Sequence, residues 1–542
     1  MPSAVFAADF VEPPVFASEN GVLDLLMIAK AKTATSISYI APGGATLHPT
    51  AWVYEICPRA AALAGNECPA SSVTVARYGG VRLALQPGDK LKIRLVNRLP
   101  KLAPLKVTHS VDPGGANLPL NLTNIHTHGM IVPARAPTLS DPTFGDDVFV
   151  EIYNSANGTP VPQKTHQHGS VVRDFVDYRI DVPANHPSGA FWFHPHIHGI
   201  ALDQVSGGLS GIISVGRAGD YASGDLFHAR FPEEQVRHLI LKDMQVLPGG
   251  TMQFRNGPAP VAVGEVQYQE DPTFCAQFPA SAGEPRQGSC PGNDNSSSGG
   301  NNYTGGSWFF TVSGQAYPTI RMTEPDGELW RLTNASGSAS YDLQLVDDAS
   351  AKPMIMQLVS VDGVSIDVPP ATALGTMMEM GGARFKVVAC PPQPSLALHS
   401  APVCISEFAM MPSSRAEVWV TYRNAAGHIV PPPSGATATF KTIGLSTGPA
   451  GDSWPAVDLA KVAFDQAGPH NLANFALDIA GDALAVNGYC TMEQWHGGQC
   501  SSVPQVVEIP FSQLGEFVYH CHILEHEDGG MMAKIRVVPA PR

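Results

Sequence analysis

Charged residues are scarce in this chain of 542 residues, where Asp, Glu, Lys and Arg together make up only 15%. Long surface helices held by Glu–Lys pairs are therefore not expected. The 33 basic residues are outnumbered by 48 acidic ones, and the net charge of −15 disfavours binding to the phosphate backbone of nucleic acids. No segment approaches the roughly 20 apolar residues of a membrane-spanning helix, so we expect a soluble protein without a membrane span.

A complete secretion signal is also missing, because residues 1–8 contain neither a basic region nor a long apolar run. This start fits the remnant of a signal peptide that has been removed. The nine cysteines form four close pairs and one remainder, Cys521; the pairs are Cys57 with Cys68, Cys275 with Cys290, Cys390 with Cys404, and Cys490 with Cys500. Zinc-knuckle spacing is absent, so the pairs indicate disulfides or buried free thiols. Disulfides would place the protein in the periplasm or outside the cell.

Turn-forming residues are abundant, with 52 glycines and 48 prolines. Between them lie short segments rich in β-branched and aromatic residues, such as 81–85, 91–96, 308–312 and 416–420. Such segments, separated by turns, are typical of an all-β protein.

An internal repeat divides the chain. Residues 86–97 contain a Pro-Gly turn, an alternating strand and a final Asn97, and a shortened copy at 324–334 ends on Asn334. Two copies predict two sandwich domains of one type. No third copy follows residue 450.

Three histidine clusters suggest a metal site. The first contains His126 and His128, the second His194 and His196, and the third His520 and His522, with Cys521 between them. A spacing of two places both imidazoles of each cluster on one face of a strand and turns Cys521 the opposite way. One short strand can thus serve two metal sites.

The third cluster also contains the ligand types of a blue-copper site. Cys521 offers a thiolate, His526 an imidazole and Met531 a thioether, and only a second imidazole is lacking. Soft sulfur ligands combined with imidazole select copper over magnesium, calcium or manganese. The odd cysteine is therefore explained as a copper ligand.

With these clusters, and with the runs at 178–183 and 411–418, the sequence resembles the multicopper oxidases, in particular the laccase-like bacterial members with three domains. The resemblance implies tandem cupredoxin-like Greek-key β-sandwiches. We expect domain 1 at residues 1–218, domain 2 at 219–450 and a shortened domain 3 at 451–542.

The resemblance also implies roles for individual residues. His126 resembles a type 2 copper ligand; His128, His194, His196, His520 and His522 resemble type 3 ligands; Cys521, His526 and Met531 resemble the type 1 set. Glu527, Asp146 and Asp147 are candidate proton donors, although each also fits an ordinary surface carboxylate. The implied activity is one-electron oxidation of phenolic or metal-ion substrates at type 1 copper, coupled to reduction of dioxygen to water at a trinuclear cluster.

One family motif is absent. Multicopper oxidases carry a His-x-x-His-x-His cluster before the Cys segment, whereas here only His470 and His496 lie between residue 451 and His520. Together with the missing third repeat, this indicates a deletion in domain 3, with a junction between His470 and Tyr489. The alternative function is therefore a copper-binding or electron-transfer protein with impaired or no oxidase turnover. A structural cupredoxin scaffold without copper is a third possibility.

Overall fold

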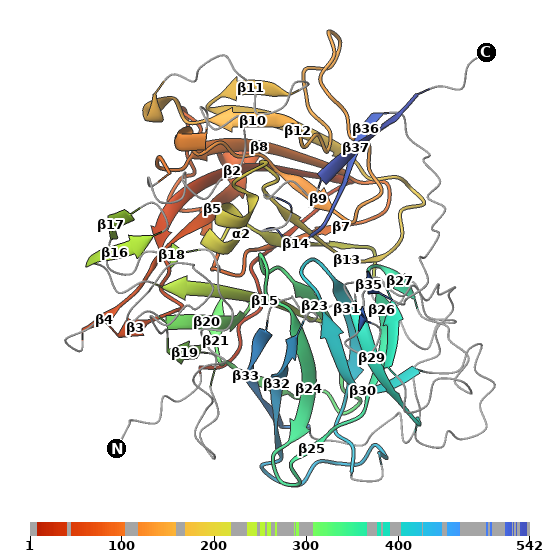
Figure 1. Cartoon of the computed structure of the whole chain (residues 1–542). Helices are drawn as coiled ribbons and strands as arrows, with labels where there is room; N and C mark the ends of the chain where they lie inside the picture. The colour runs from red at the N-terminus through yellow and green to blue at the C-terminus, as the bar shows by residue number, and fades with distance from the viewer. Residues whose placement is uncertain are drawn as a thin grey trace.

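The computed structural model describes most of the chain. The described residues are 8–40, 45–102, 118–158, 169–217, 236–246, 250–254, 257–261, 266–267, 287, 289–291, 307–365, 377–380, 383–390, 403–424, 427–446, 453–466, 495–496, 499–500, 515–522, 524, 527 and 532–538. Strands dominate throughout (Figure 1). Within this part, no helix is long and apolar enough to cross a membrane.

The N-terminal unit contains two five-stranded sheets. One has the order β1 (Val15–Ala17), β7 (Arg82–Leu85), β14 (Gly211–Val215), β13 (Gly189–His194), β9 (His126–His128). The other has the order β12 (Phe175–Asp181), β8 (Lys90–Arg98), β2 (Val22–Thr33), β5 (Thr50–Pro58), β6 (Thr74–Val75). Small two-stranded sheets pair β3 (Tyr39–Ile40) with β4 (Thr46–Leu47) and β10 (Val150–Tyr153) with β11 (Ser170–Arg173).

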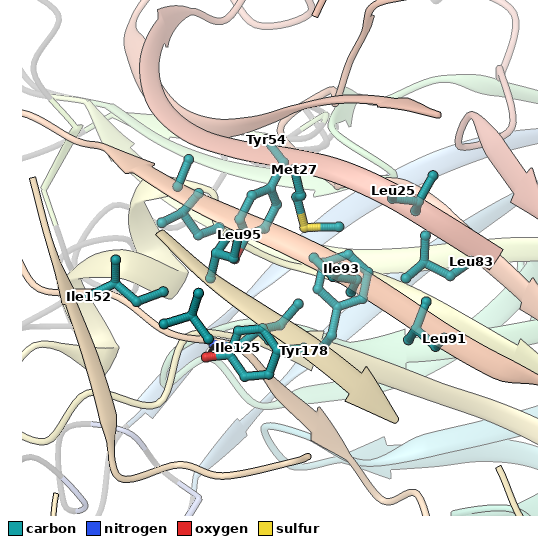
Figure 2. Packing of buried hydrophobic residues seen from close by; sticks show 14 of the residues in the cluster. Leu25, Met27, Tyr54, Leu83, Leu91, Ile93, Leu95, Ile125, Ile152 and Tyr178 are labelled. Atoms are coloured by element: carbon teal, nitrogen blue, oxygen red, sulfur yellow. Dashed lines mark hydrogen bonds between the residues drawn. The ribbon is translucent and has the colours of Figure 1, made fainter. Parts of the chain in front are cut away.

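A shared apolar core joins the two large sheets. Along β8 the buried residues Leu91, Ile93 and Leu95 alternate with more exposed charged ones, so one face of the strand is apolar. These side chains pack with Leu83 from the opposite sheet and with Met27 (Figure 2). Burial of one face of each sheet against the other is what makes this unit a sandwich.

The second unit is one continuous, folded-over sheet. Its main strands are β15 (Val236–Val246), β20 (Ser307–Val312), β22 (Thr319–Met322), β23 (Glu328–Asn334), β24 (Tyr341–Asp347), β26 (Met356–Val361), β30 (Val403–Met410), β31 (Arg415–Val420), β32 (Thr437–Ser446) and β33 (Ser453–Phe464). Shorter strands of the same sheet are β18 (Val266–Gln267), β19 (Ser289–Pro291), β21 (Gln315–Ala316), β25 (Lys352–Pro353), β27 (Val364–Ser365), β28 (Met377–Met380) and β29 (Ala383–Val388). A second large core, which includes Trp330, Phe408 and Phe440, fills its interior.

Three smaller pairs of strands complete the described sheet structure. They are β16 (Gly250–Phe254) with β17 (Gly257–Val261), β34 (Trp495–His496) with β35 (Gln499–Cys500), and β36 (Gly515–His520) with β37 (Met532–Val537). The pair β36–β37 lies beside β9 of the N-terminal unit (Figure 1). The predicted domain boundaries stay a prediction, and β33, beyond residue 450, pairs with β32 of the second unit.

The sequence repeat corresponds to one structural element in both units. Gly88 and Gly327 each adopt a positive φ, 92° and 91°, at the turn that precedes β8 and β23. At the far end, the Asn97 amide donates to the carbonyls of Asn121 and Ile152, and the Asn334 amide donates to those of Ala339 and Met410. Each asparagine therefore binds the loop that follows its strand to a neighbouring strand. The predicted turn, strand and asparagine are found in both places.

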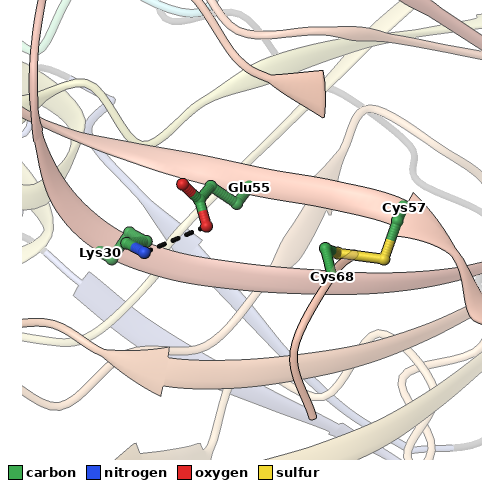
Figure 3. Close-up of a disulfide and its surroundings, with 4 residues drawn as sticks. All are labelled: Lys30, Glu55, Cys57 and Cys68. Carbon is green, nitrogen blue, oxygen red and sulfur yellow. Dashed lines mark hydrogen bonds and ion pairs between the residues drawn. A yellow bond between two sulfur atoms is a disulfide. The ribbon is translucent and has the colours of Figure 1, made fainter. Parts of the chain in front are cut away.

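Two of the four predicted disulfides lie in the described part and are formed. Cys57, at the end of β5, is bonded to Cys68 (Figure 3), and Cys390 is bonded to Cys404. Next to the first, Lys30 and Glu55 form a cross-strand ion pair of 3.0 Å. Each bond closes a short loop, which is worth about 3 kcal/mol by restricting the unfolded chain. Cys275 and Cys490, which belong to the other two pairs, lie outside the described residues.

A buried lysine connects the two units. The Nζ of Lys242 on β15 donates to Ser210 Oγ, 2.7 Å away in the N-terminal unit, and the lysine is completely buried. Burial lowers the pKa of Lys242 to about 7, although the neighbouring Asp243 opposes this shift. The folded protein therefore binds this proton more weakly than the unfolded chain does.

We expect the substitution Lys242→Met to remove a pH dependence of stability. Between pH 7 and the ordinary lysine pKa of 10.5, the unfolded chain holds a proton that the folded state has released, so wild-type stability rises with pH in this window. The rise attributable to Lys242 should be about 2 to 4 kcal/mol between pH 7 and 10. Urea denaturation of both proteins at pH 7 and pH 9.5 measures it, with exposed Lys352→Met as the control. If the free energy of unfolding changed equally with pH in the wild type and in Lys242→Met, the expectation would be contradicted.

Candidate metal centre

The first two histidine clusters lie on adjacent strands. His126 and His128 belong to β9, and the antiparallel pairing with β13 places His194 directly opposite His126. The rings of His126 and His194 have centroids 5.4 Å apart, and those of His128 and His194 are 5.7 Å apart. Because residues two apart on a strand face the same side, this register brings three imidazoles to one face of the sheet.

His196 is held in place by a side chain outside the clusters. Asn124 Oδ1 accepts from the His196 N–H at 2.6 Å, and the Asn124 amide donates to the His196 carbonyl at 3.3 Å and to Val148 at 2.9 Å. This buried asparagine binds the loop after β13 to the segment that leads into β9. No motif in the sequence marks Asn124, whose only signal is that of a polar residue two positions before the first cluster.

The third cluster reaches the same place from the C-terminal end of β36. The Nε2 atoms of His520 and His196 are 3.0 Å apart, and the rings of His522 and His128 meet edge to face with centroids 4.5 Å apart. His520 and His522 therefore face the same site, as their spacing predicts. All six predicted cluster histidines converge, although they are up to 396 positions apart in the sequence.

Several of these imidazole nitrogens lack a hydrogen-bond partner among the described residues. They are His128 Nδ1, His194 Nε2 and both ring nitrogens of His522, all inaccessible to solvent. Burial lowers the pKa of His128 and His194 well below the usual value, that of His196 to about 4 and that of His522 to about 3. Neutral imidazoles with unused lone pairs are costly to bury unless a cation binds them. The donor set therefore fits copper.

Asp146 supports the first cluster from behind. Its carboxylate lies 3.0 Å from His126 Nδ1 and accepts from the Thr127 N–H at 2.9 Å. Burial alone would raise the pKa of Asp146, but the charge of His126 and these hydrogen bonds outweigh it and lower the pKa. Because this carboxylate engages Nδ1, Nε2 is the nitrogen of His126 that remains available to a metal. The neighbouring Asp147 instead accepts from the Phe149 N–H at 2.9 Å.

Glu527 is buried between two of the histidines. Its carboxylate is 3.0 Å from His520 Nδ1 and 3.6 Å from His196 Nε2, and the side chain has no exposed surface. Burial raises the pKa of Glu527, but the charges of His196 and His520 and the hydrogen bond from His520 outweigh it and hold it below the usual range. The sequence predicts Glu527 as a candidate acid, and the structure places it within the histidine group.

A pocket of about 410 Å³ opens onto these side chains. Its wall includes the histidines of the first and third clusters, together with one residue of the second unit. The lining residues are His126, His128, Ala134, Asp146, Val148, Ser413, Val518, Tyr519, His520 and His522. Ser413 precedes Arg415, whose guanidinium packs so closely on Gly129 that a Cβ there would lie 2.7 Å from Arg415 Nη2. The second unit therefore forms part of the site wall.

The remaining predicted ligands are only partly described. Cys521 is half-buried and forms no disulfide, while His526 and Met531 lie outside the described residues. The predicted type 1 set stays a prediction.

Leu524 attaches the third cluster to the rest of the site. Its side chain is fully buried against Ala201, Leu202 and Val205 of helix α2 (Ala201–Gly207), which follows the second cluster, and its N–H donates to the Gly337 carbonyl at 3.0 Å. The packing of Leu524 against α2, together with this hydrogen bond, thus helps to hold the third cluster next to the second.

We expect Leu524→Ala to weaken copper binding at His520 and His522. The lost contact allows the third cluster to move relative to the second, and loss of such supporting contacts typically costs about 10- to 100-fold in metal affinity. Competition with a copper chelator measures this affinity, and Leu63→Ala, on an exposed leucine, is the control. Unchanged affinity would show that the cluster is held by other contacts.

The chain resembles known proteins in sequence and fold. Residues 503–541 match the family model of the multicopper oxidases. Over 31 residues the chain is 55% identical to the multicopper oxidase Mco of Staphylococcus haemolyticus, covering 6% of this chain and 7% of that protein. Over 320 residues it is 20% identical to a laccase of Bacillus stratosphericus, covering 57% of this chain and 51% of the laccase. The matches thus span about half or less of these curated relatives.

The likeness in structure extends over nearly the whole chain. The fold is similar to that of the McoA multicopper oxidase of Aquifex aeolicus, with a TM-score of 0.52, 14% identity, and coverage of 97% of this chain and 98% of that one. At this identity the similarity concerns the fold. The predicted all-β class with cupredoxin-like sandwiches is confirmed.

Proposed function

We propose that this chain, which belongs to the multicopper oxidase family, couples one-electron oxidation of phenolic or metal-ion substrates to reduction of dioxygen to water. The observation that carries the proposal is the convergence of six histidines, three of which, His128, His194 and His522, have buried ring nitrogens without a hydrogen-bond partner among the described residues. Copper bound there would supply reversible one-electron chemistry and a site for dioxygen.

The proposed ligand roles follow the family pattern. His126 would hold type 2 copper, and His128, His194, His196, His520 and His522 would hold the type 3 pair. Cys521, His526 and Met531 would hold type 1 copper. The close grouping of His126, His128 and His194, whose ligand atoms lie within 4.8 Å of one another, supports a shared centre for the first two clusters.

The chain itself supplies a short path for electrons. Cys521 is bonded through the backbone to both His520 and His522, whose rings are 5.2 Å apart and face the histidine centre. In addition, the His520 ring nitrogen Nδ1 lies 3.0 Å from the Cys521 carbonyl oxygen. The thiolate position and the histidine centre are thus connected almost entirely through bonds.

Two carboxylates would transfer protons in the proposed reaction. Asp146 lines the pocket and orients His126, and Glu527 contacts His196 and His520. Reduction of dioxygen to water consumes protons, so acids next to the site would shorten the transfer. Asp147 is a weaker candidate because its carboxylate caps the following loop.

We further propose a periplasmic or secreted location. The two disulfides in the described part support it, because such bonds persist in oxidising compartments. The substrates would then be small reductants present outside the cytoplasm, together with dioxygen.

A copper-binding or electron-transfer role without turnover is the second candidate. The absence of a His-x-x-His-x-His segment anywhere in the chain favours it, since each copper type would lack an imidazole that the family normally provides. Fixed ligand geometry governs both redox tuning and oxygen reduction.

Copper content, visible absorption and oxygen uptake together distinguish these functions. The protein is loaded with Cu(II), dialysed, and supplied with a phenol or with Cu(I) in air. Bound copper with oxygen consumption supports the oxidase, and bound copper without consumption supports the electron-transfer role. A chain that binds no copper would contradict both.

A further inference from the structure

Two histidines and a carboxylate form a compact group within the candidate centre. One ligand atom each of His196, His520 and Glu527 lies within 4.8 Å of the others. Two donors on one metal with bonds of about 2.0 to 2.2 Å can be at most roughly 4.4 Å apart, so small side-chain shifts would bring all three onto one ion. Two imidazoles and a carboxylate are a common donor set for divalent transition metals.

The two carboxylates of the site have different surroundings. Asp146 is engaged by His126 Nδ1 and by the Thr127 N–H, so it supports a ligand from outside. Glu527 likewise contacts a ring nitrogen through one oxygen, since its Oε2 lies 3.0 Å from His520 Nδ1. Its other oxygen, Oε1, lies 3.6 Å from His196 Nε2, beyond hydrogen-bond distance, and has no hydrogen-bond partner among the described residues. A carboxylate oxygen with unused lone pairs therefore lies next to a ligand nitrogen.

Charge balance also favours a cation at this position. Glu527 has no exposed surface, and His196 is almost completely buried as well. A buried carboxylate is costly unless a positive charge compensates it, and without a metal only the neighbouring imidazoles, such as His520 at 3.0 Å, offer that charge to Glu527 among the described contacts. A divalent ion would provide that charge and would at the same time use the lone pairs of the two imidazoles.

We propose that Glu527 is a metal ligand, which together with His196 and His520 binds one copper ion of the centre. The carboxylate would take the place of an imidazole that the absent His-x-x-His-x-His segment would otherwise supply. This inference rests on the proposed function for the identity of the metal, and it gives Glu527 a role different from that of a proton donor alone.

Copper stoichiometry of Glu527→Gln tests the proposal. The amide has the shape of the carboxylate but neither its charge nor its affinity for metals. Wild type and variant are loaded with Cu(II) and dialysed against a weak chelator; copper per chain is then measured, and the Cu(II) paramagnetic resonance spectrum is recorded. We expect the variant to lose one copper per chain, or to bind it at least about 100-fold more weakly, since removal of a direct ligand exceeds the effect of a supporting residue.

Three further variants make the result specific. Glu67→Gln is the matched control, because it makes the same exchange at an exposed carboxylate, and it should keep the full copper count. Asp146→Asn removes a carboxylate that supports a ligand from outside, and it should weaken copper binding less than Glu527→Gln does, by about 10- to 100-fold. Glu527→Asp retains a carboxylate and should therefore bind more copper per chain than Glu527→Gln does. Far-ultraviolet circular dichroism establishes that each variant is folded.

The outcomes separate this inference from the proposed function. If Glu527→Gln keeps its full copper and an unchanged resonance spectrum, the inference is overturned. This holds even if oxygen uptake is lost, because loss of activity without loss of copper is the result expected for a proton donor. Loss of copper in this variant supports the inference even if the wild type consumes no oxygen, in which case only the oxidase function fails. A wild type without bound copper overturns both.

Discussion

Cys521→Ser is expected to abolish the intense visible absorption of the copper-loaded protein and to reduce oxygen uptake to background. The blue absorption of cupredoxin-type sites arises from the copper–thiolate bond, and a serine hydroxyl does not provide this bond at neutral pH. Cys521 is also the only cysteine outside the four predicted pairs, so no other thiol is expected to replace it. Absorption spectroscopy and an oxygen electrode measure the two effects.

The variant should retain the copper held by the histidine clusters. His520 and His522 are positioned by β36 and by their contacts with His196 and His128, which do not involve the thiol. We therefore expect a loss of one copper per chain, with the remainder unchanged. A blue band that persists in Cys521→Ser would show that the thiolate is not the ligand, whereas loss of all copper would show that the three clusters do not bind independently.

The second large effect concerns stability and is expected for Arg331→Met. Arg331 of β23 and Glu417 of β31 are directly paired across the sheet, and the Arg331 Nε donates to Glu417 Oε1 at 2.8 Å. Their side chains are only 1% and 2% exposed. Removing one partner takes this ion pair from the other charge in a buried position, which typically costs about 3 to 5 kcal/mol. Denaturation by urea should show a loss of this size.

The double variant Arg331→Met/Glu417→Leu is the control. Replacing both charges by apolar groups of similar volume removes the desolvation cost together with the attraction, so most of the lost stability should return. If the double variant is as unstable as the single one, packing at these positions matters more than charge. A single variant that loses less than about 1 kcal/mol would mean that other groups or water compensate the charge of Glu417.

Much of the local structure can be predicted from the sequence. The strands expected at 81–85, 91–96, 308–312 and 416–420 correspond to β7, β8, β20 and β31 within a residue or two. These segments are predictable because β-branched and aromatic residues and turn residues act over a few positions. The alternation itself is visible in β8 but not in β23, which is buried on both faces. A strand that is buried on both faces has no solvent-exposed face, so its sequence does not alternate between apolar and polar residues.

The histidine spacing predicts the shared face of each cluster, and the tertiary structure decides which clusters meet. Nothing local in the sequence places His194 opposite His126; this follows from the pairing of β13 with β9. In the same way, the contact between His196 and His520 joins residues 324 positions apart. Strand neighbours are chosen by burial of whole sheet faces, which no short segment encodes by itself.

Residues that support the site or the core from outside the motifs were likewise found only in the tertiary structure. Asn124, Leu524 and Arg331 carry no motif, and their roles depend on partners contributed by distant strands and loops. Residue chemistry at short spacing predicts the all-β class, the repeated turn and strand, the two disulfides of the described part and the shared face within each histidine cluster, because each depends on neighbouring positions. The position of Glu527 between His196 and His520 follows instead from the tertiary structure, because a contact of this kind exists only after separate units have packed.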